Sequence, residues 1–435
     1  MKHDIVIVGA GAAGCVAAYF LAKQCFNVVL VERKPQEKIG VKVCGDAVGE
    51  HHFKNIGIEP PKLGEDATLM LDNVRVFSPN KRYYVDVYGS AYALDRHRFG
   101  QRLLRMAQAA GAALYDQHRV VEPIIKGHTV QGVKAQHETG KTIDIMGKIT
   151  VDASGATAVV RNKLPLGWWI SEKTAHEDYN IGYREILETR EEINAKHAMI
   201  YLSQKHVPGG YWWFFPKGRN IVNVGLGVQW KQGYHNPKTN YFKHVRPQLP
   251  KIVHVISAGG AIVPTRRPIS CMVWNGFVVV GDAACTANPI HGGGIGPAMM
   301  SAYQAAKTIE EALSSGEPTI EALWSYPHGY IRAYGAKQAS LDILRRYLQQ
   351  MSDDDLDFVL ERGIVNSKEL SGIGYQGELR LSVVTKTMMA LRLLERPSLL
   401  VRLKEAKEYM DKARDQYLNY PEKPKEFLRW RQETE

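Results

Sequence analysis

The first 32 residues contain two short apolar runs separated by a helical pattern of small and apolar residues. Residues 4–8 (Asp-Ile-Val-Ile-Val) and 27–31 (Asn-Val-Val-Leu-Val) are β-branched runs with the length of buried strands. Residues 16–22 between them follow an apolar helix pattern. The order predicts a strand–helix–strand unit at the start of the chain.

The pattern of apolar and polar residues then switches several times between helical and strand-like periodicity. A helix is predicted from Asp95 to Gly111, with Leu103, Leu104 and Ala107 on one face, and strands are predicted at 119–125, 129–137 and 149–152. Residues 166–258 alternate like an antiparallel sheet and carry five of the eight tryptophans, which predicts a sheet domain with an aromatic surface. A buried strand at 277–280 and a helix up to residue 313 follow. Beyond residue 330 the chain reads as helical, with an amphipathic stretch at 385–410 that Pro397 should divide into two helices.

Glycines between the first strand and helix point to a dinucleotide. Gly9 suits a tight turn, Gly11 lets a pyrophosphate approach the backbone, and Gly14 lets helix and strand pack closely. The helix N-terminus would face the phosphates. Glu32 follows the second strand, where an acidic side chain accepts the ribose hydroxyls.

A second glycine cluster extends this prediction to a flavin. Asp282, at the end of a predicted strand, is placed to accept a hydrogen bond from a ribityl hydroxyl. The glycines at 292–294 precede a helix and allow the backbone to approach an isoalloxazine ring. The N-terminus of that helix can stabilise negative charge on a reduced flavin.

Several motifs together resemble the FAD-dependent p-hydroxybenzoate-hydroxylase superfamily. They are Gly9-x-Gly11-x-x-Gly14 with Glu32, Asp95-Arg96-x-x-Phe99, the turn at 152–155, and Gly281-Asp282. Two further blocks, Lys42-x-Cys44-Gly45-Asp46 and 210–218 (Gly-Tyr-Trp-Trp-Phe-Phe-Pro-Lys-Gly), resemble the geranylgeranyl reductases within it. The resemblance covers residues 4 to about 313.

The resemblance implies a set of FAD contacts. Gly9, Gly11, Ala13 and Gly14 would hold the phosphates, Glu32 the ribose, and Val121 the adenine. Arg96 would reach the ribityl and phosphate region. The remaining implied FAD contacts are Asp282, Gly294 and Ile295 at the ribityl chain and ring, and Cys44, Gly45 and Ala47 beside the isoalloxazine.

The resemblance also implies the reaction. The expected enzyme is an FAD-dependent oxidoreductase that reduces isolated C=C bonds in geranylgeranyl chains of isoprenoid ether phospholipid precursors, or in geranylgeranyl diphosphate. Tyr211, Trp213 and Phe215 would line a hydrocarbon pocket, whose aromatic faces would stabilise developing positive charge. Cys44, Tyr211 and Trp213 are the candidate catalytic residues. Cys44 would either supply or position a proton, or simply pack on the flavin.

Two other activities are compatible with a flavin site. An FAD-dependent monooxygenase of an aromatic or lipid substrate would consume NADPH and oxygen. An electron-transfer flavoprotein docking at a membrane would need a cluster of ligating cysteines, which five scattered cysteines do not provide. The native electron donor stays open between ferredoxin and NAD(P)H.

The expected fold class is α/β (α+β overall), with three regions. A discontinuous Rossmann-type FAD-binding domain would span 1–60, 92–165 and 259–325; an antiparallel-sheet substrate domain 61–91 and 166–258; and a C-terminal helical region 326–435. The sheet domain and the C-terminal helices would together form a substrate tunnel ending at the flavin.

Composition limits the partners and the location. The 435 residues are 45% hydrophobic and 23% charged, as in globular proteins. The odd, scattered cysteines predict neither a metal site nor a disulfide framework, and they suit a reduced intracellular setting. No signal peptide or membrane span is evident. The net charge of +11, without a nucleic-acid-binding motif, favours phosphate or an anionic membrane over nucleic acid. We therefore expect a cytoplasmic protein, peripheral at the inner face of the cell membrane through basic residues at 386–407.

Overall fold

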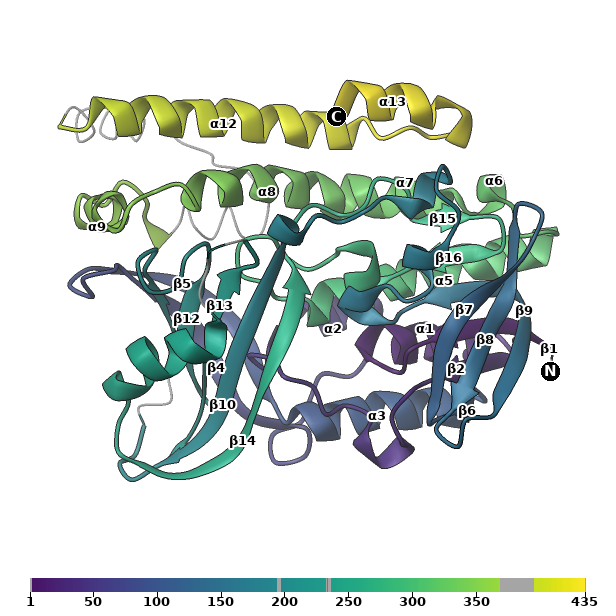
Figure 1. Ribbon diagram of the computed structural model, residues 1–435, viewed down its shortest axis with the longest axis horizontal. Helices are drawn as coiled ribbons and strands as arrows, with labels where there is room; N and C mark the ends of the chain where they lie inside the picture. Colours follow the sequence, from purple (N-terminus) through teal and green to yellow (C-terminus); the bar gives the residue numbers. More distant parts are fainter. Residues whose placement is uncertain (1, 194–196, 232, 234–235, 368–394, 435) are drawn as a thin grey trace.

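The computed structural model describes residues 2–193, 197–231, 233, 236–367 and 395–434. Within these residues the strands form two eight-stranded sheets, and a layer of C-terminal helices covers one side of the molecule (Figure 1). The mixed α/β architecture with a helical C-terminal region is the one that the sequence predicts.

The first sheet is built around the N-terminal strand. Its strands run in the order β15-β16-β9-β1-β2-β6, and β7 and β8 continue the sheet from β9. The strands are β1 (Lys2–Val8), β2 (Val28–Val31), β6 (Ala113–Tyr115), β7 (His118–Lys126), β8 (Thr129–His137), β9 (Thr142–Asp152), β15 (Val273–Trp274) and β16 (Phe277–Val279). β1 lies parallel to both β2 and β9. Ile5, Val6 and Ile7 have no solvent exposure, which explains why β1 is a continuous apolar run rather than an alternating one.

Three helices position the nucleotide loop against this sheet. They are α1 (Ala12–Lys23), α3 (Arg96–Ala109) and α5 (Ile295–Ser315), and α1 packs against both others. Asp95 caps α3 by accepting a hydrogen bond from the Arg98 backbone N–H at 3.0 Å. Leu103, Leu104 and Ala107 are buried, so the predicted apolar face of this helix is confirmed.

The second sheet runs in the order β14-β10-β13-β12-β11-β4-β5-β3. Its strands are β3 (Ala47–Gly49), β4 (Ala67–Phe77), β5 (Tyr84–Leu94), β10 (Tyr179–Thr189), β11 (His197–Leu202), β12 (Tyr211–Pro216), β13 (Ile221–Gln229) and β14 (Ile252–Pro264). Neighbouring strands are antiparallel except for β4 and β11. The short helix α4 (Pro237–Asn240) lies between β13 and β14.

The division into domains stays a prediction, but the second sheet crosses its boundaries. β5 continues to Leu94, and β3 brings residues 47–49 into this sheet. β14 passes residue 258 and pairs with β10 as far as Pro264. Gly259 and Gly260 suggest a turn in the sequence, yet both are paired with β10, because neighbouring-strand hydrogen bonds outweigh their weak strand propensity.

The five tryptophans of residues 166–258 do not form one aromatic surface. Trp168 precedes the sheet and stacks on Trp274 at 5.1 Å between ring centroids, while Trp169 packs against Phe427. Trp212 is buried in the core of the second sheet. The expected aromatic surface is therefore wrong as a whole, because the chain reverses several times between these residues.

The C-terminal helices cover one side of both sheets in two rows (Figure 1). They are α8 (Ala336–Leu348), α9 (Asp353–Glu361), α12 (Pro397–Leu418) and α13 (Phe427–Thr434), and the short helices α6 (Ile320–Leu323) and α7 (Ser325–Tyr330) come just before them in the chain. A further short helix, α2 (His51–Ile56), belongs to the N-terminal part of the chain. α12 packs along α8. It begins at Pro397, a position where proline suits a helix start. The predicted amphipathic stretch before residue 395 lies outside the described residues.

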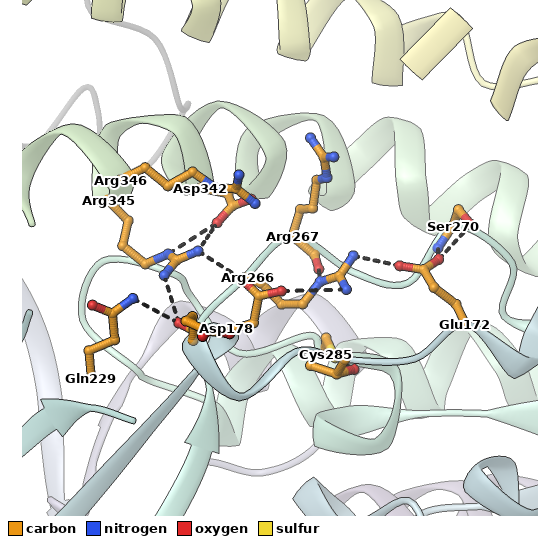
Figure 2. Close-up of polar contacts among 12 residues, drawn as sticks. Glu172, Asp178, Gln229, Arg266, Arg267, Ser270, Cys285, Asp342, Arg345 and Arg346 are labelled. Carbon is orange, nitrogen blue, oxygen red and sulfur yellow. Dashed lines mark hydrogen bonds and ion pairs between the residues drawn. The ribbon is translucent and has the colours of Figure 1, made fainter. Parts of the chain in front are cut away.

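A chain of buried charges joins α8 to the second sheet (Figure 2). Arg345 on α8 binds Asp178 at 3.1 Å and Asp342 at 2.7 Å. Arg266, which follows β14, binds Glu172 at 2.6 Å. Burial raises the pKa of Glu172, but Arg266 and Ser270 outweigh it, so the net pKa is lowered and the carboxylate stays charged. Arg266 also approaches Asp178 at 3.8 Å, so these ion pairs link α8 to the start of β10 and the end of β14.

Candidate functional site

The glycine loop after β1 has the geometry that its sequence predicts. Gly9 has φ of +99°, a left-handed value that favours glycine. A Cβ at Gly14 would lie 1.8 Å from the Gly9 carbonyl oxygen, so α1 and the loop approach closely only because residue 14 lacks a side chain. A Cβ at Gly11 would meet nothing within 4 Å among the described atoms. Open space therefore lies in front of Gly11, at the N-terminus of α1 where Ala13 contributes to the first turn.

Acidic and basic side chains flank this loop. Glu32 accepts a hydrogen bond from the Ala10 backbone N–H at 2.8 Å and another from the Lys34 N–H at 3.0 Å. The Nε of Arg96 is buried and has no hydrogen-bond partner within the described structure. Val121 lies on β7, and its carbonyl accepts a hydrogen bond from Lys163. Among the predicted adenosine and phosphate residues, the glycine loop and Glu32 therefore lie where β1 and β2 end, whereas Arg96 begins α3 and Val121 lies on β7.

The second glycine cluster meets two other predicted segments. Asp282 lies in the turn Gly281–Ala284, and a Cβ at Gly294 would be 2.9 Å from its Oδ1. That oxygen is buried without a hydrogen-bond partner in the described part of the chain. The other oxygen of Asp282 faces the Lys42 ammonium at 3.4 Å. Gly294 caps α5, and Ile295 is its first residue. The segments 42–47, 281–284 and 292–295 therefore converge.

These observations fit an FAD molecule. A dinucleotide needs backbone without side chains at its pyrophosphate, and Gly11 leaves that space open. The ribityl chain carries hydroxyl donors, and Asp282 Oδ1 is a buried acceptor without a partner among the described atoms. Arg96 Nε is a buried donor that likewise has no hydrogen-bond partner among the described atoms. The role of each residue as an FAD contact stays a prediction.

The aromatic block lines one face of β12. Tyr211, Trp213 and Phe215 alternate with the buried Trp212, Phe214 and Pro216. The ring centroids of Tyr211 and Trp213 are 6.2 Å apart, as are those of Trp213 and Phe215. The Tyr211 hydroxyl donates to the His291 carbonyl at 2.6 Å, and a Cβ at Gly45 would be 3.1 Å from the Phe215 ring. This face of the sheet is therefore turned toward the segments that converge on Asp282.

A buried polar network holds the Cys44 loop against this aromatic face. Asn223 on β13 donates to the Cys44 carbonyl at 2.8 Å and to Asp46 at 3.0 Å, and its oxygen accepts from Trp213 Nε1 at 3.0 Å. Lys217 forms an ion pair with Asp46 at 3.0 Å. The side chains of Lys217 and Asp46 are only 8% and 1% exposed. One network therefore sets both the loop and the indole ring.

The pKa of the tyrosine on this face is shifted. Burial, with a smaller effect from Cys44, raises the pKa of Tyr211, so its hydroxyl stays protonated. Cys44 is half-buried and Ala47 begins β3. The structure thus brings Cys44, Gly45, Tyr211, Trp213 and Phe215 into one wall.

Sequence reasoning missed the residues that hold this wall. Asn223, Asp46 and Lys217 received no role, and neither did Arg184, which donates to the Cys44 carbonyl at 3.4 Å. One signal was available: a polar Asn between valines in a strand, and a lysine directly after an aromatic strand, both suggest buried polar partners. Their common target, the loop 42–46, lies far away in sequence.

Comparisons with known proteins agree with this geometry. The family profile described as "Geranylgeranyl reductase catalytic domain" matches residues 178–263, and the one described as "FAD dependent oxidoreductase" matches residues 4–162. The chain is 40% identical to the digeranylgeranylglycerophospholipid reductase of Sulfolobus acidocaldarius over 439 residues, covering 100% of this chain and 97% of the relative. It is 30% identical to digeranylgeranylglycerophospholipid reductase 1 of Methanococcoides burtonii, covering 82% and 86%.

Solved structures share the fold. The geranylgeranyl bacteriochlorophyll reductase-like protein of Thermoplasma acidophilum superposes with a TM-score of 0.78 at 22% identity, covering 93% of this chain and 99% of that one. A myxobacterial chondrochloren halogenase follows with 0.66 at 18% identity, covering 90% and 97%. Fold and site together define an FAD-dependent oxidoreductase. Within that class, the chain belongs to the geranylgeranyl reductase family.

Proposed function

We propose that this FAD-dependent reductase saturates isolated C=C bonds in the geranylgeranyl chains of isoprenoid ether phospholipid precursors, as a step of membrane lipid biosynthesis. The observation that carries the proposal is the aromatic wall of Tyr211, Trp213 and Phe215, turned toward the loop of Cys44 and Gly45. Geranylgeranyl diphosphate offers the same hydrocarbon and is the second candidate substrate.

The wall suits an alkene that no carbonyl polarises. The proposed contacts that would hold FAD are the glycine loops, Glu32, Arg96, Val121, Asp282, Gly294 and Ile295. Once reduced, the bound flavin would supply the hydride for one alkene carbon. A proton would reach the less substituted carbon together with the hydride or just before it, so positive charge would develop on the more substituted carbon, which the hydride joins. The faces of Trp213 and Tyr211 would stabilise that charge. Asn223 keeps the Trp213 ring in place through its 3.0 Å hydrogen bond.

A proton must reach the other alkene carbon. Tyr211 keeps its proton because its pKa is raised, and it directs that proton at the His291 carbonyl. Cys44 is close enough to act electrostatically on Tyr211, and its thiol is the second candidate group on the wall for handling the proton. We assign the proton-positioning role to this pair.

The direct test is an anaerobic assay with dithionite and a digeranylgeranyl phospholipid, followed by mass spectrometry. We expect products heavier by successive pairs of hydrogen atoms, with partly saturated species early. A product that carries oxygen, formed only in air with NADPH, would establish the monooxygenase instead. Repeating the anaerobic assay with ferredoxin and with NAD(P)H in place of dithionite identifies the electron donor.

Peripheral membrane association is proposed through the basic residues at 386–407, of which those up to 394 lie outside the described residues. No helix in the described part of the chain is long and apolar enough to cross a membrane. In the described part, Arg396 and Arg402 both bind Asp355, at 3.0 and 2.8 Å, whereas Lys404 is exposed. Flotation with anionic vesicles at low and high salt tests the proposal, and equal recovery with neutral vesicles would contradict it.

A further inference from the structure

A cavity lies behind the glycine loop of α5, and none of its lining residues is among the FAD or substrate contacts proposed above. It measures about 220 Å³ and lies where α2, the segment before α5 and the start of α8 meet. Its lining residues are His51, His52, Asn55, Asn288, Pro297, Tyr334, Lys337 and Gln338. A volume of this size is smaller than the ~300–1,000 Å³ of pockets for drug-sized ligands, so it suits a small group.

Cationic and N–H-donating groups converge on this cavity. The rings of His51 and His52 lie 4.0 Å apart, and Lys337 faces them from α8. His291 is close enough to act electrostatically on His52. None of the eight described lining residues carries a carboxylate. Within the lining that the structure describes, Lys337 supplies the positive charge and the imidazoles of His51 and His52 supply N–H groups.

The amide side chains of the cavity are already engaged in holding its walls. Gln338 donates hydrogen bonds to the carbonyls of Thr286 and Ala287. Asn288 accepts from the backbone N–H groups of Ile290 and His291, at 2.9 and 3.3 Å. In contrast, the Nδ1 atom of His52 is buried without a hydrogen-bond partner in the described structure. A ligand in the cavity could therefore form a hydrogen bond with His52 Nδ1.

Burial is the main cause of lowered pKa values among the basic groups at this cavity. Burial, together with His51, Lys337 and His291, lowers the pKa of His52 to about 3. Burial and Lys337 lower the pKa of His291 to about 4. Burial lowers the pKa of Lys337 as well. A bound anion would reverse these shifts, because it favours the protonated form of every one of these groups.

We propose that this cavity is a phosphate-binding site in which Lys337, His52 and His51 hold the anion. Its position makes the phosphate head group of the lipid substrate the relevant source, an identification that rests on the proposed function. His291 joins the two sites, because its carbonyl accepts the Tyr211 hydroxyl on the aromatic wall. A head group held here would fix the register of the hydrocarbon chain along that wall. Free inorganic phosphate shares the same chemistry and is separated from the lipid below.

The first experiment measures binding of inorganic phosphate to the FAD-loaded protein by isothermal titration calorimetry, without turnover. Lys337→Gln should weaken binding at least about tenfold, the effect of one lost charged hydrogen bond, and Lys337→Arg should restore most of it. His52→Gln should weaken it in the same direction. The matched control is Lys54→Gln, which removes the same charge from an exposed position on α2 and should leave binding unchanged. Absent phosphate binding, or an equal loss in Lys54→Gln, would overturn the proposal.

The second experiment identifies the source of the phosphate. Initial rates of anaerobic alkene reduction are compared for a digeranylgeranylglycerol lipid with and without its phosphate. Lys337→Gln should raise KM for the phospholipid about tenfold and leave KM for the phosphate-free lipid unchanged. Equal effects on both lipids would overturn the head-group assignment and leave a site for free phosphate. A third outcome separates the site from the proposed function. If the unsubstituted protein binds phosphate, Lys337→Gln does not, and the unsubstituted protein reduces neither lipid, the proposed function is refuted and the anion site is upheld.

Discussion

The two sheets of this protein contribute to its site in different ways. The first sheet is mostly parallel and is buried on both faces around β1. It contributes to the site through the loops that follow its strands. The second is mostly antiparallel; along β12 it buries one row of side chains in its core and presents the other to the site. The proposed FAD contacts are thus largely backbone and glycine, whereas the proposed hydrocarbon wall consists of alternating side chains.

This contrast predicts which substitutions matter in each sheet. In the first sheet, replacing a glycine with a residue that has a Cβ should disrupt the site, because the backbone there must approach a neighbour or a ligand. In the second, adjacent residues have opposite tasks, because successive side chains point to opposite faces. The following experiments test the contrast, beginning with the largest expected effect.

Gly14→Ala and Gly11→Leu should separate folding from FAD binding within one loop. The new Cβ at residue 14 would lie 1.8 Å from the Gly9 carbonyl oxygen, so we expect destabilisation above about 4 kcal/mol. Gly11→Leu meets no described atom within 4 Å of its Cβ and should fold, yet it should be colourless because it blocks the pyrophosphate. Thermal denaturation and flavin absorbance of the purified proteins decide; a yellow Gly11→Leu protein would contradict the loop assignment.

Lys217→Met should show how strongly the second sheet depends on its buried ion pair. The substitution leaves Asp46 charged and 1% exposed, and breaking a buried pair in this way costs about 3–5 kcal/mol. Urea denaturation measures the loss. The control is Lys134→Met in the first sheet, whose partner Glu122 lies at 2.7 Å but is exposed, and there we expect little change. Equal losses in both variants would show that burial of the pair is not the determining factor.

Trp212→Ala and Trp213→Ala compare two neighbours on opposite faces of β12. Trp212 is 6% exposed and stacks on Tyr201 at 3.7 Å, so its loss should destabilise the protein by about 3–5 kcal/mol. Trp213→Ala should keep its FAD content but slow alkene reduction about tenfold or more, through lost stabilisation of the developing cation. Single-turnover kinetics and denaturation curves give both quantities. A normal rate of alkene reduction in Trp213→Ala would contradict the proposed role of Trp213 in the wall.

Acid should weaken the protein through the histidines behind the α5 loop, and this effect is the smallest. The pKa of His52 is about 3 when folded and ordinarily about 6.5, so the unfolded chain binds more protons between these values. Stability therefore falls as the pH drops below about 6.5. Between pH 7 and 5 we expect a loss on the order of 1 kcal/mol, allowing for partial solvent screening. Urea denaturation at both pH values should show a smaller loss in His52→Gln and with added phosphate; identical slopes in both proteins would contradict this origin.

Local sequence determined the strand–helix–strand unit and the start of α3. The apolar run of β1, the glycines at 9, 11 and 14, and the Asp95 cap act on neighbours within a few residues, so their geometry is readable without the rest of the chain. The alternation in β12 likewise predicted that Tyr211, Trp213 and Phe215 share a face.

Tertiary structure alone decided what that face meets. Asn223 and Lys217 reach the loop of Cys44 and Asp46 across more than 170 positions of sequence, and His52 meets Lys337 across a still longer separation. No local propensity encodes such a meeting, because it depends on how β12, β13 and α8 pack against the first sheet. Sequence also placed five tryptophans in one aromatic surface, but the folded chain distributes them among separate clusters, since periodicity fixes the face of a strand and not its neighbour.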